Sequence, residues 1–442
     1  MNLNQKKYTK NRKMVYFLGF FTILISLSSS NAWSTFPIGN ELFWWIIQFV
    51  FIFILIKLKK NYTSPLIEKN FLFVKLYLYW NVVCIVRGIF VADNYWEWKN
   101  LILTSFFLFL PLLVYLANNS QFIQILVNTW FKYALFLFVL VLPFLFGDAV
   151  GKFLIPFSFL LLFFPILDFK WKIIVLLVTV FVITFDLTAR SNVIKFVIPL
   201  AIGLLFYFRK FRPIKILNFS RLFLLFVPFV FLFFAISGVF NVFKMDEYVG
   251  EYDTSSKTET GEVVESNATD DTRTFLYVEV LESALRHNYV FLGRTPARGN
   301  DSESFGEDLK FRLKTGKLER FSNEVSILNI FTWLGVVGVV LYFLIFIKAS
   351  YLAINQSNNI FMKLIGLNVA FRWTYGWVED FSNFDLSNIF LWIMIGMCFS
   401  ESFRKMTDQE VRIWVRGIFE REKPFSRRMR HILEFTNNNN NI

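Results

Sequence analysis

Cysteine, histidine and charged residues are all scarce in this sequence. Its 442 residues include two cysteines and two histidines, and only 18% of them are charged. Cys84 and Cys398 each fall within a long apolar run, so the sequence predicts no disulfide framework, no metal site and no cofactor. A soluble domain is excluded as well, because one core could not hide the apolar surface of a chain that is 55% hydrophobic.

Long apolar segments, by contrast, are abundant in this sequence. Runs of about 20 apolar residues match the ~30 Å hydrocarbon layer of a bilayer at the rise of an α-helix. We therefore predict an all-α polytopic membrane protein with about twelve spans. The predicted spans are 14–27, 42–56, 71–91, 101–117, 125–146, 153–167, 173–185, 193–208, 222–243, 325–347, 361–378 and 386–399.

The net charge of +13 is interpreted as a sign of orientation. Lysine and arginine collect on the cytoplasmic side of membrane proteins, so the charge does not indicate a nucleic-acid partner. Both termini are then cytoplasmic. The predicted division is a membrane domain over 1–243, a large periplasmic loop over 244–324 between spans nine and ten, three further spans within 325–400, and a cytoplasmic tail over 401–442 with an amphipathic helix on the inner membrane surface.

The large loop is expected to contain an amphipathic helix near residues 271–287. Asp271 is placed to cap the start of this helix. Thr274, Val278, Leu281 and Leu285 recur at spacings of three and four, so they form one apolar stripe. We expect the helix to pack on another part of the protein through this stripe.

Five arginines are predicted at or near the outer membrane surface, against the usual bias of positive charge to the inside. They are Arg87, Arg190, Arg273, Arg294 and Arg298. A guanidinium donates paired hydrogen bonds to phosphate oxygens, so several of them together could hold a doubly phosphorylated lipid carrier. The alternative for each is a lipid headgroup or a nearby carboxylate, such as Asp93 or Asp186. Asp186 is itself a further site candidate.

Three more ionisable residues are site candidates. Arg372 lies deep in a predicted span, where charge is costly and marks function by default, although pairing with Glu379 or Asp380 explains it equally well. Glu324 ends the loop at the membrane, where desolvation could raise its pKa toward that of a general base, or it simply stabilises a helix amino terminus. His287 is a second candidate base, or a stabiliser of a helix carboxyl end.

Tryptophans near the predicted membrane edges allow two interpretations. Trp96, Trp98, Trp333, Trp373 and Trp377 either stack on sugar rings or belong to the aromatic belts that membrane proteins place at headgroup level.

The order of these parts resembles the O-antigen ligase and polymerase superfamily of bacterial cell envelopes. The resemblance covers residues 170 to 345 and rests on the segments Thr188-Ala189-Arg190-Ser191, Asp271-Thr272-Arg273, Leu292-Gly293-Arg294 and Trp333-Leu334-Gly335-Val336-Val337-Gly338. It implies a lipid diphosphate-linked glycan donor, with Arg190 and Arg273 at the diphosphate, Arg294 and Arg298 lining the same loop site, and no metal. Ser322-Asn323-Glu324 stands where the ligase branch commonly has a His-Asn pair, which favours a polymerase.

The expected function is therefore polymerisation of polysaccharide repeat units carried on undecaprenyl diphosphate, at the periplasmic face of a bacterial inner membrane. The expected partners are that lipid-linked oligosaccharide, membrane lipids and a protein that regulates chain length. An O-antigen ligase is the nearest alternative. A flippase for lipid-linked sugars is another, but the paired repeats and broken helices typical of transporters are not evident in the sequence.

Overall fold

Helices make up nearly all of the secondary structure in the computed structural model, which describes residues 3–62, 71–186, 189–241, 243–244, 253–257, 263–267 and 273–419. The predicted all-α class is thus confirmed. The exceptions are two small antiparallel sheets, one of β1 (Asp253–Lys257) with β2 (Val263–Asn267) and one of β3 (Asn300–Asp301) with β4 (Glu319–Arg320).

Within the described residues, eight helical segments are long and apolar enough to cross a membrane. By helix length and hydropathy the chain is therefore a multi-pass membrane protein, as predicted. The segments lie in α1 (Leu3–Asn31), α2 (Glu41–Tyr62), α4 (Leu72–Ile89), α5 (Tyr95–Leu108) with η2 (Leu110–Leu112) and α6 (Leu113–Ala117), α7 (Ser120–Val141) with η3 (Leu142–Phe144), α11 (Arg190–Leu204) with η5 (Leu205–Tyr207), α12 (Ile214–Ile236) and α16 (Ser326–Asn355).

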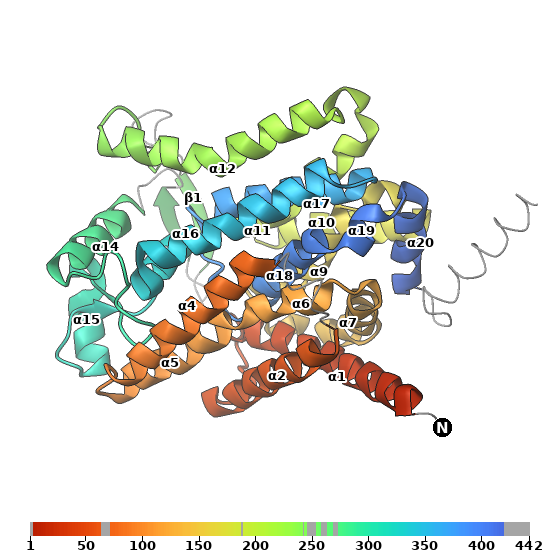
Figure 1. Ribbon diagram of the computed structural model, residues 1–442. Coiled ribbons are helices and arrows are strands. Elements are labelled where there is room, and N and C mark those ends of the chain that lie inside the picture. Colours follow the sequence, from red (N-terminus) through yellow and green to blue (C-terminus); the bar gives the residue numbers. More distant parts are fainter. Residues whose placement is uncertain are drawn as a thin grey trace, which may run out of the picture.

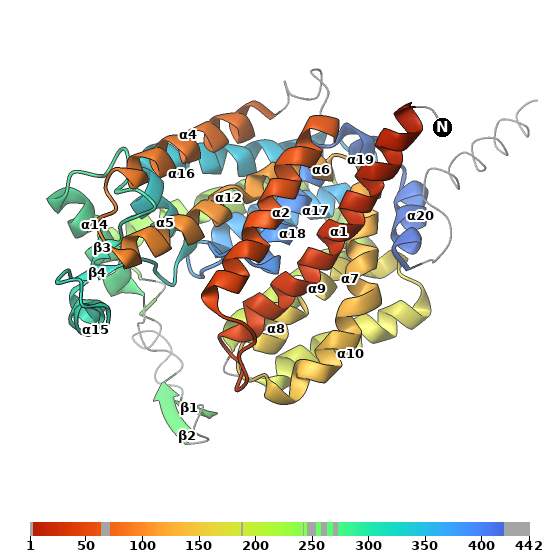
Figure 2. The same ribbon diagram turned by 90° about the horizontal axis from the view of Figure 1, so that it is seen from below.

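The four other predicted spans coincide with shorter helices. These are α8 (Ala149–Phe153) with α9 (Ile155–Leu161) and η4 (Phe164–Ile166), α10 (Phe169–Phe185), α17 (Ile360–Tyr375) and α18 (Leu386–Phe399). All residues of α18 are buried, so this helix forms the centre of the bundle. In Figures 1 and 2, α18 is surrounded by other helices, while α12 runs along one flank.

The two ends of the bundle carry different elements (Figure 1). One end carries α14 (Thr274–Arg286) and α15 (Glu303–Leu313), which belong to the loop before α16; we refer to it as the α14 end. The other end carries the amino terminus and α20 (Asp408–Phe419), which follows α19 (Glu401–Lys405). The short η6 (Arg209–Phe211) precedes α12.

A break in α16 anchors the loop that precedes it. Gly335 has a φ of 68°, which only glycine adopts readily, and it interrupts the helical backbone there. The segment around Gly293 packs into the break: Arg294 N donates to Thr332 O at 2.7 Å, and Val336 N donates to Val290 O at 2.9 Å. Backbone groups freed by the break are thus satisfied by the loop, which fixes the loop to the membrane helices.

The predicted helix in the loop is present, but its buried face was predicted wrongly. The structure begins α14 at Thr274, and Asp271 lies outside the described residues. The apolar side chains that α14 buries are Leu276, Val280 and Ala284, whereas Val278, Leu281 and Leu285 are all exposed. Both sets recur at helical spacing, so periodicity alone could not decide which one packs on the protein.

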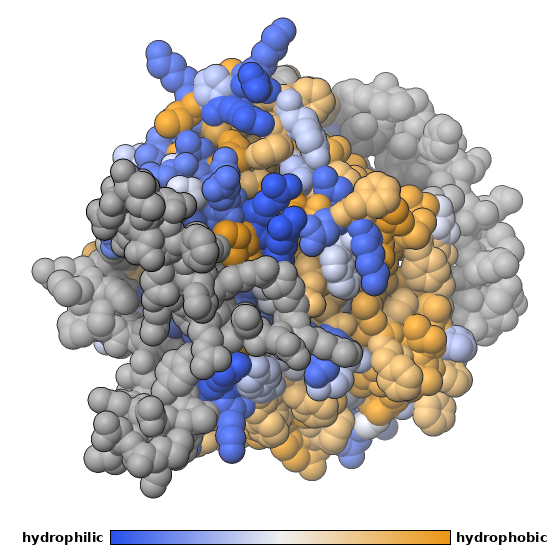
Figure 3. Space-filling model, turned by 90° about the vertical axis from the view of Figure 1, so that its right-hand side faces the viewer, coloured by the Kyte–Doolittle hydropathy of each residue, from blue (hydrophilic) through white to orange (hydrophobic). Residues whose placement is uncertain are grey.

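The amphipathic helix predicted in the tail is α20, and its apolar face covers protein. Trp414 is fully buried and donates from Nε1 to Ser120 O at 2.9 Å, while Gln124 Nε2 donates to Trp414 O at 2.8 Å. Arg416 pairs with Asp168 at 2.9 Å. These contacts dock α20 on α7 and the start of α10. Figure 3 views this end of the molecule, where hydrophilic residues gather beside a wide hydrophobic area.

Candidate functional site

A cavity of about 1130 Å³ lies at the α14 end of the bundle. We call it the central cavity. Its walls come from the ends of α1 and α5, from α8, from the start of α11, and from the segments that precede α14, α16 and α18. Five basic and five acidic side chains line it: Lys152, Arg190, Lys195, Arg273, Arg320, Asp148, Glu324, Glu379, Asp380 and Asp385. Such a density of charge beside apolar helices is typical of a functional site.

Arg190 and Arg273, which are 83 residues apart in the sequence, both line the central cavity. Arg190 is the first residue of α11 and is exposed. Arg273 directly precedes α14; its Nε donates to Val378 O at 2.7 Å, and its Nη2 lies 3.8 Å from Glu379 Oε2. The two guanidinium groups predicted to hold a diphosphate therefore face the same space.

Glu379 is one of several charged residues of the central cavity that were not predicted as part of a site. Its two carboxylate oxygens lie 3.8 Å from Lys195 Nζ and 3.8 Å from Arg273 Nη2. Burial raises the pKa of Glu379, and the charges of Lys195 and Arg273 oppose this increase. The signal in the sequence is Lys195, an ionisable residue within a predicted span, because a charge in such a position implies a counter-ion nearby.

Glu324 also lines the central cavity, but it is less enclosed than Glu379. Its side chain is 52% exposed and lies 3.2 Å from Arg320 Nη2. It directly precedes Val325, which occupies the N-cap position of α16. Both roles predicted for Glu324, as a base and as a favourable charge at a helix amino terminus, are compatible with this position.

Arg87 lies outside the central cavity. Its Nη1 donates to Leu292 O at 2.7 Å and its Nη2 to Gly293 O at 3.2 Å. Trp80 Nε1 donates to Leu334 O at 2.9 Å from the same helix, α4. Both side chains thus hold the junction between the loop and the break in α16, which gives Arg87 a structural role.

Arg294, Arg298 and His287 belong to a separate ionic cluster around Asp301 and Glu319. Arg294 bridges the two acids at 2.9 Å each, Arg298 pairs with Glu319, and His287 Nε2 lies 2.7 Å from Asp301 Oδ2. Burial by itself would raise the pKa of Asp301, but the hydrogen bonds with His287 and Arg294 outweigh it and lower that pKa. The hydrogen bond with Glu319 raises the pKa of Arg298. This cluster fastens β3 and β4 to α14.

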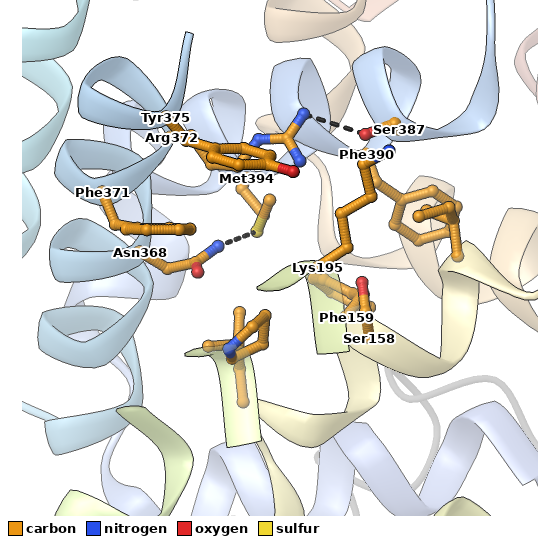
Figure 4. Close-up of a pocket in the computed structure, with 13 residues that line it drawn as sticks. Ser158, Phe159, Lys195, Asn368, Phe371, Arg372, Tyr375, Ser387, Phe390 and Met394 are labelled. Carbon is orange, nitrogen blue, oxygen red and sulfur yellow. Dashed lines mark hydrogen bonds between the residues drawn. The ribbon is translucent and has the colours of Figure 1, made fainter. Parts of the chain in front are cut away.

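Arg372 lines a small pocket of about 20 Å³, which has room for a water molecule (Figure 4). The side chain is 8% exposed, and its Nη2 donates to Ser387 Oγ at 2.9 Å. This pocket shares Ile155, Lys195, Tyr375 and Ser387 with the central cavity, so it extends the cavity toward the middle of the bundle. Asp186, at the carboxyl end of α10, is not among the described residues that line either space.

A mostly apolar groove of about 450 Å³ adjoins the central cavity. It lies between α11, α12, α14 and α17 and includes Val278 and Leu281, two of the exposed residues of α14. The lining residues that it shares with the central cavity are Ile194, Phe243, Tyr375 and Val378. An apolar surface and a charged cavity are therefore continuous at this end of the molecule.

Among the described residues, no group of three or more His, Cys, Asp or Glu side chains could hold a metal ion. Comparison of the chain with protein-family models, with curated proteins and with solved structures found no match. The roles of the site residues thus follow from geometry and chemistry alone.

Proposed function

We propose that this protein polymerises polysaccharide repeat units, transferring a glycan from undecaprenyl diphosphate to the hydroxyl group of an acceptor sugar. The observation that carries this proposal is the continuity of the charged central cavity with the apolar groove. A polyprenyl diphosphate has the same two parts, a charged head and an apolar chain. Each part then contacts a surface that matches its polarity.

The arginines of the central cavity supply the contacts for the head group. Arg190 and Arg273 donate hydrogen bonds to the diphosphate oxygens and stabilise the negative charge that develops as this group departs. The groove between α11, α12, α14 and α17 takes the first isoprene units of the carrier. Its position on the flank of the bundle, where α12 exposes large apolar side chains, suits a ligand that arrives from the lipid phase.

Glu379 is the preferred general base in this reaction. The acceptor oxygen attacks the anomeric carbon of the donor glycan, the bond from that carbon to the diphosphate breaks, and its electron pair leaves with the diphosphate. The hydroxyl proton passes to the Glu379 carboxylate. A diphosphate bound to Arg273 competes with Glu379 for that guanidinium, so donor binding leaves Lys195 as the cation paired with the carboxylate and makes the carboxylate a stronger base. Glu324 is the second candidate for this role.

The proposed topology has twelve spans, the eight long segments together with α8–α9, α10, α17 and α18. Both termini are then cytoplasmic, and the central cavity faces the periplasm across a bacterial inner membrane. A regulator of chain length is the proposed protein partner. Cysteines introduced singly before α1 and at Ser304, which is exposed in α15, test this topology: only the second should react with an impermeant maleimide in intact spheroplasts.

The test of the reaction is reconstitution of the purified protein in liposomes with purified lipid-linked repeat unit, analysed on a gel. A ladder of products linked to the carrier supports a polymerase. Transfer of the glycan only to added lipid A-core would instead identify a ligase. If the lipid-linked unit is unchanged under both conditions, the proposed function is wrong.

A further inference from the structure

A second pocket at the α14 end, of about 390 Å³, lies between the start of α5 and the helix α15. We call it the α5–α15 pocket. Three aromatic side chains line it, Trp96, Phe305 and Phe321, together with polar side chains that include Asn100 and Arg320. The function proposed above leaves this pocket without a role.

The lining of the α5–α15 pocket suits a carbohydrate. Aromatic rings offer apolar faces against which the C–H groups of a sugar ring pack, while amide, hydroxyl and guanidinium groups bond to its hydroxyls. Asn100, Ser322 and Arg320 provide such groups among the lining residues. The volume is within the range of small-ligand pockets and exceeds the needs of a single water or ion.

Two of the three aromatic rings that line the pocket each have a cation over one face. Lys99 Nζ lies 4.9 Å from the centre of the Trp96 ring, and the Arg320 guanidinium lies 4.3 Å from the centre of the Phe305 ring. Glu279 of α14 accepts hydrogen bonds from the amides of Glu303 and Ser304, the first residues of α15, at 3.0 and 2.8 Å. The wall that α15 provides is therefore fixed before any ligand binds.

The α5–α15 pocket opens into the central cavity. The two spaces share Asn100, Leu103, Arg320 and Ser322 as lining residues. The ion pair of Arg320 with Glu324, at 3.2 Å, stands where they meet. The apolar groove joins the central cavity through a different set of residues, which are Ile194, Phe243, Tyr375 and Val378. A ligand in the α5–α15 pocket thus reaches the cavity by a route separate from the lipid carrier.

We infer that the α5–α15 pocket is a glycan-binding subsite that holds the terminal sugars of the acceptor, with Trp96 and Phe305 as its stacking residues. This inference rests on the proposed function, because it assigns the second substrate of that reaction. The inference explains why two spaces, the apolar groove and the α5–α15 pocket, both open into the central cavity. The donor occupies the groove and the cavity, and the acceptor hydroxyl enters the cavity past Arg320.

The test is saturation-transfer NMR of the full-length protein in nanodiscs, with the free oligosaccharide released by mild acid from the envelope polysaccharide of the producing cell. We expect Trp96→Ala and Phe305→Ala each to weaken binding about tenfold, the loss of one well-packed ring contact. Trp98→Ala and Phe311→Ala are matched controls, since these residues lie on the same two helices, are 41% and 83% exposed, and do not line the pocket. Trp96→Phe, which keeps a ring, should bind nearly as well as the wild type.

The inference is overturned if the wild type does not bind the oligosaccharide, or if the two control variants weaken binding as much as the two pocket variants. A melting curve for each variant separates loss of binding from loss of folding. The polymerisation assay distinguishes the two proposals. If no polymer forms but binding depends on Trp96 and Phe305, the subsite is retained and the reaction is wrong. If polymer forms and the acceptor KM is the same in Trp96→Ala as in the wild type, the subsite is wrong.

Discussion

Replacing Arg190 and Arg294 separately by glutamine separates substrate binding from stability. Arg190 is exposed at the start of α11, whereas the Arg294 side chain is 10% exposed, so we expect the loss of Arg190 to lower the free energy of unfolding less than the loss of Arg294. If it donates to the diphosphate, one charge-assisted hydrogen bond worth about 1.5–3 kcal/mol disappears. We expect kcat/KM to fall about 10- to 150-fold, with a Tm closer to that of the wild type than the Tm of Arg294→Gln.

Arg294 should behave in the opposite way. Its side chain is 10% exposed and bridges Asp301 and Glu319 at 2.9 Å each. Removing one partner of a buried ion pair costs about 3–5 kcal/mol, and the lower end applies here because Glu319 keeps Arg298. We expect Arg294→Gln to melt several degrees lower, while the protein that remains folded has wild-type kcat/KM.

The assays are thermal unfolding of the purified variants and single-turnover transfer from lipid-linked repeat unit, normalised to folded protein. The reasoning is refuted if Arg190→Gln is fully active, since the diphosphate then does not depend on this guanidinium. It is refuted equally if Arg294→Gln loses activity at an unchanged Tm, because the ionic cluster would then contribute to the reaction.

Three further predictions concern residues with distinct environments. Glu379→Gln should reduce kcat about 10²- to 10⁴-fold. Burial raises the pKa of Glu379 above the ordinary glutamate value of 4.5, so the wild-type rate should begin to fall at a pH above that value as the pH is lowered. The same acidic limb of the pH–rate profile should persist in Glu324→Gln. Gly335→Ala should prevent folding, because the new Cβ would lie 2.3 Å from a backbone oxygen. Its control is Gly316→Ala, which has a similar φ of +70° and no neighbour within 4 Å, and which should fold. Monodispersity of each purified variant in detergent is the measurement. The lowered pKa of Asp301 stabilises the fold fully above the ordinary value of 3.8 and less as the pH falls below it, so Asp301→Asn should lower Tm at neutral pH and have little effect at low pH.

The fold class followed from the sequence because membrane insertion depends on local properties. A run of about 20 apolar residues crosses the membrane as a helix whatever its neighbours are, because within the bilayer only a helix satisfies the hydrogen bonds of a single segment's backbone. The long runs around α2, α4, α7 and α16 were found for this reason. The boundaries were less secure: α12 ends at Ile236, earlier than the predicted limit at Phe243.

Which helix face is buried was not determined locally. On α14, Val278 and Leu281 were as good candidates for burial as Leu276 and Val280, because both pairs recur at helical spacing. Only the placement of α14 against its neighbours separated them. The sequence likewise contained the apolar stripe of α20 but not its partner, which is protein and not lipid.

By itself the sequence determined that the chain is a multi-pass helical membrane protein and that an unusual set of arginines accompanies its polar loop. Only the tertiary structure decided how those arginines divide. Arg190 and Arg273 line one charged cavity, whereas Arg87, Arg294 and Arg298 bind backbone carbonyls or carboxylates of the loop. A guanidinium bonds equally well to a phosphate, a carboxylate or a carbonyl, so its partner is set by whatever the fold brings within reach, and residue type and spacing do not record that.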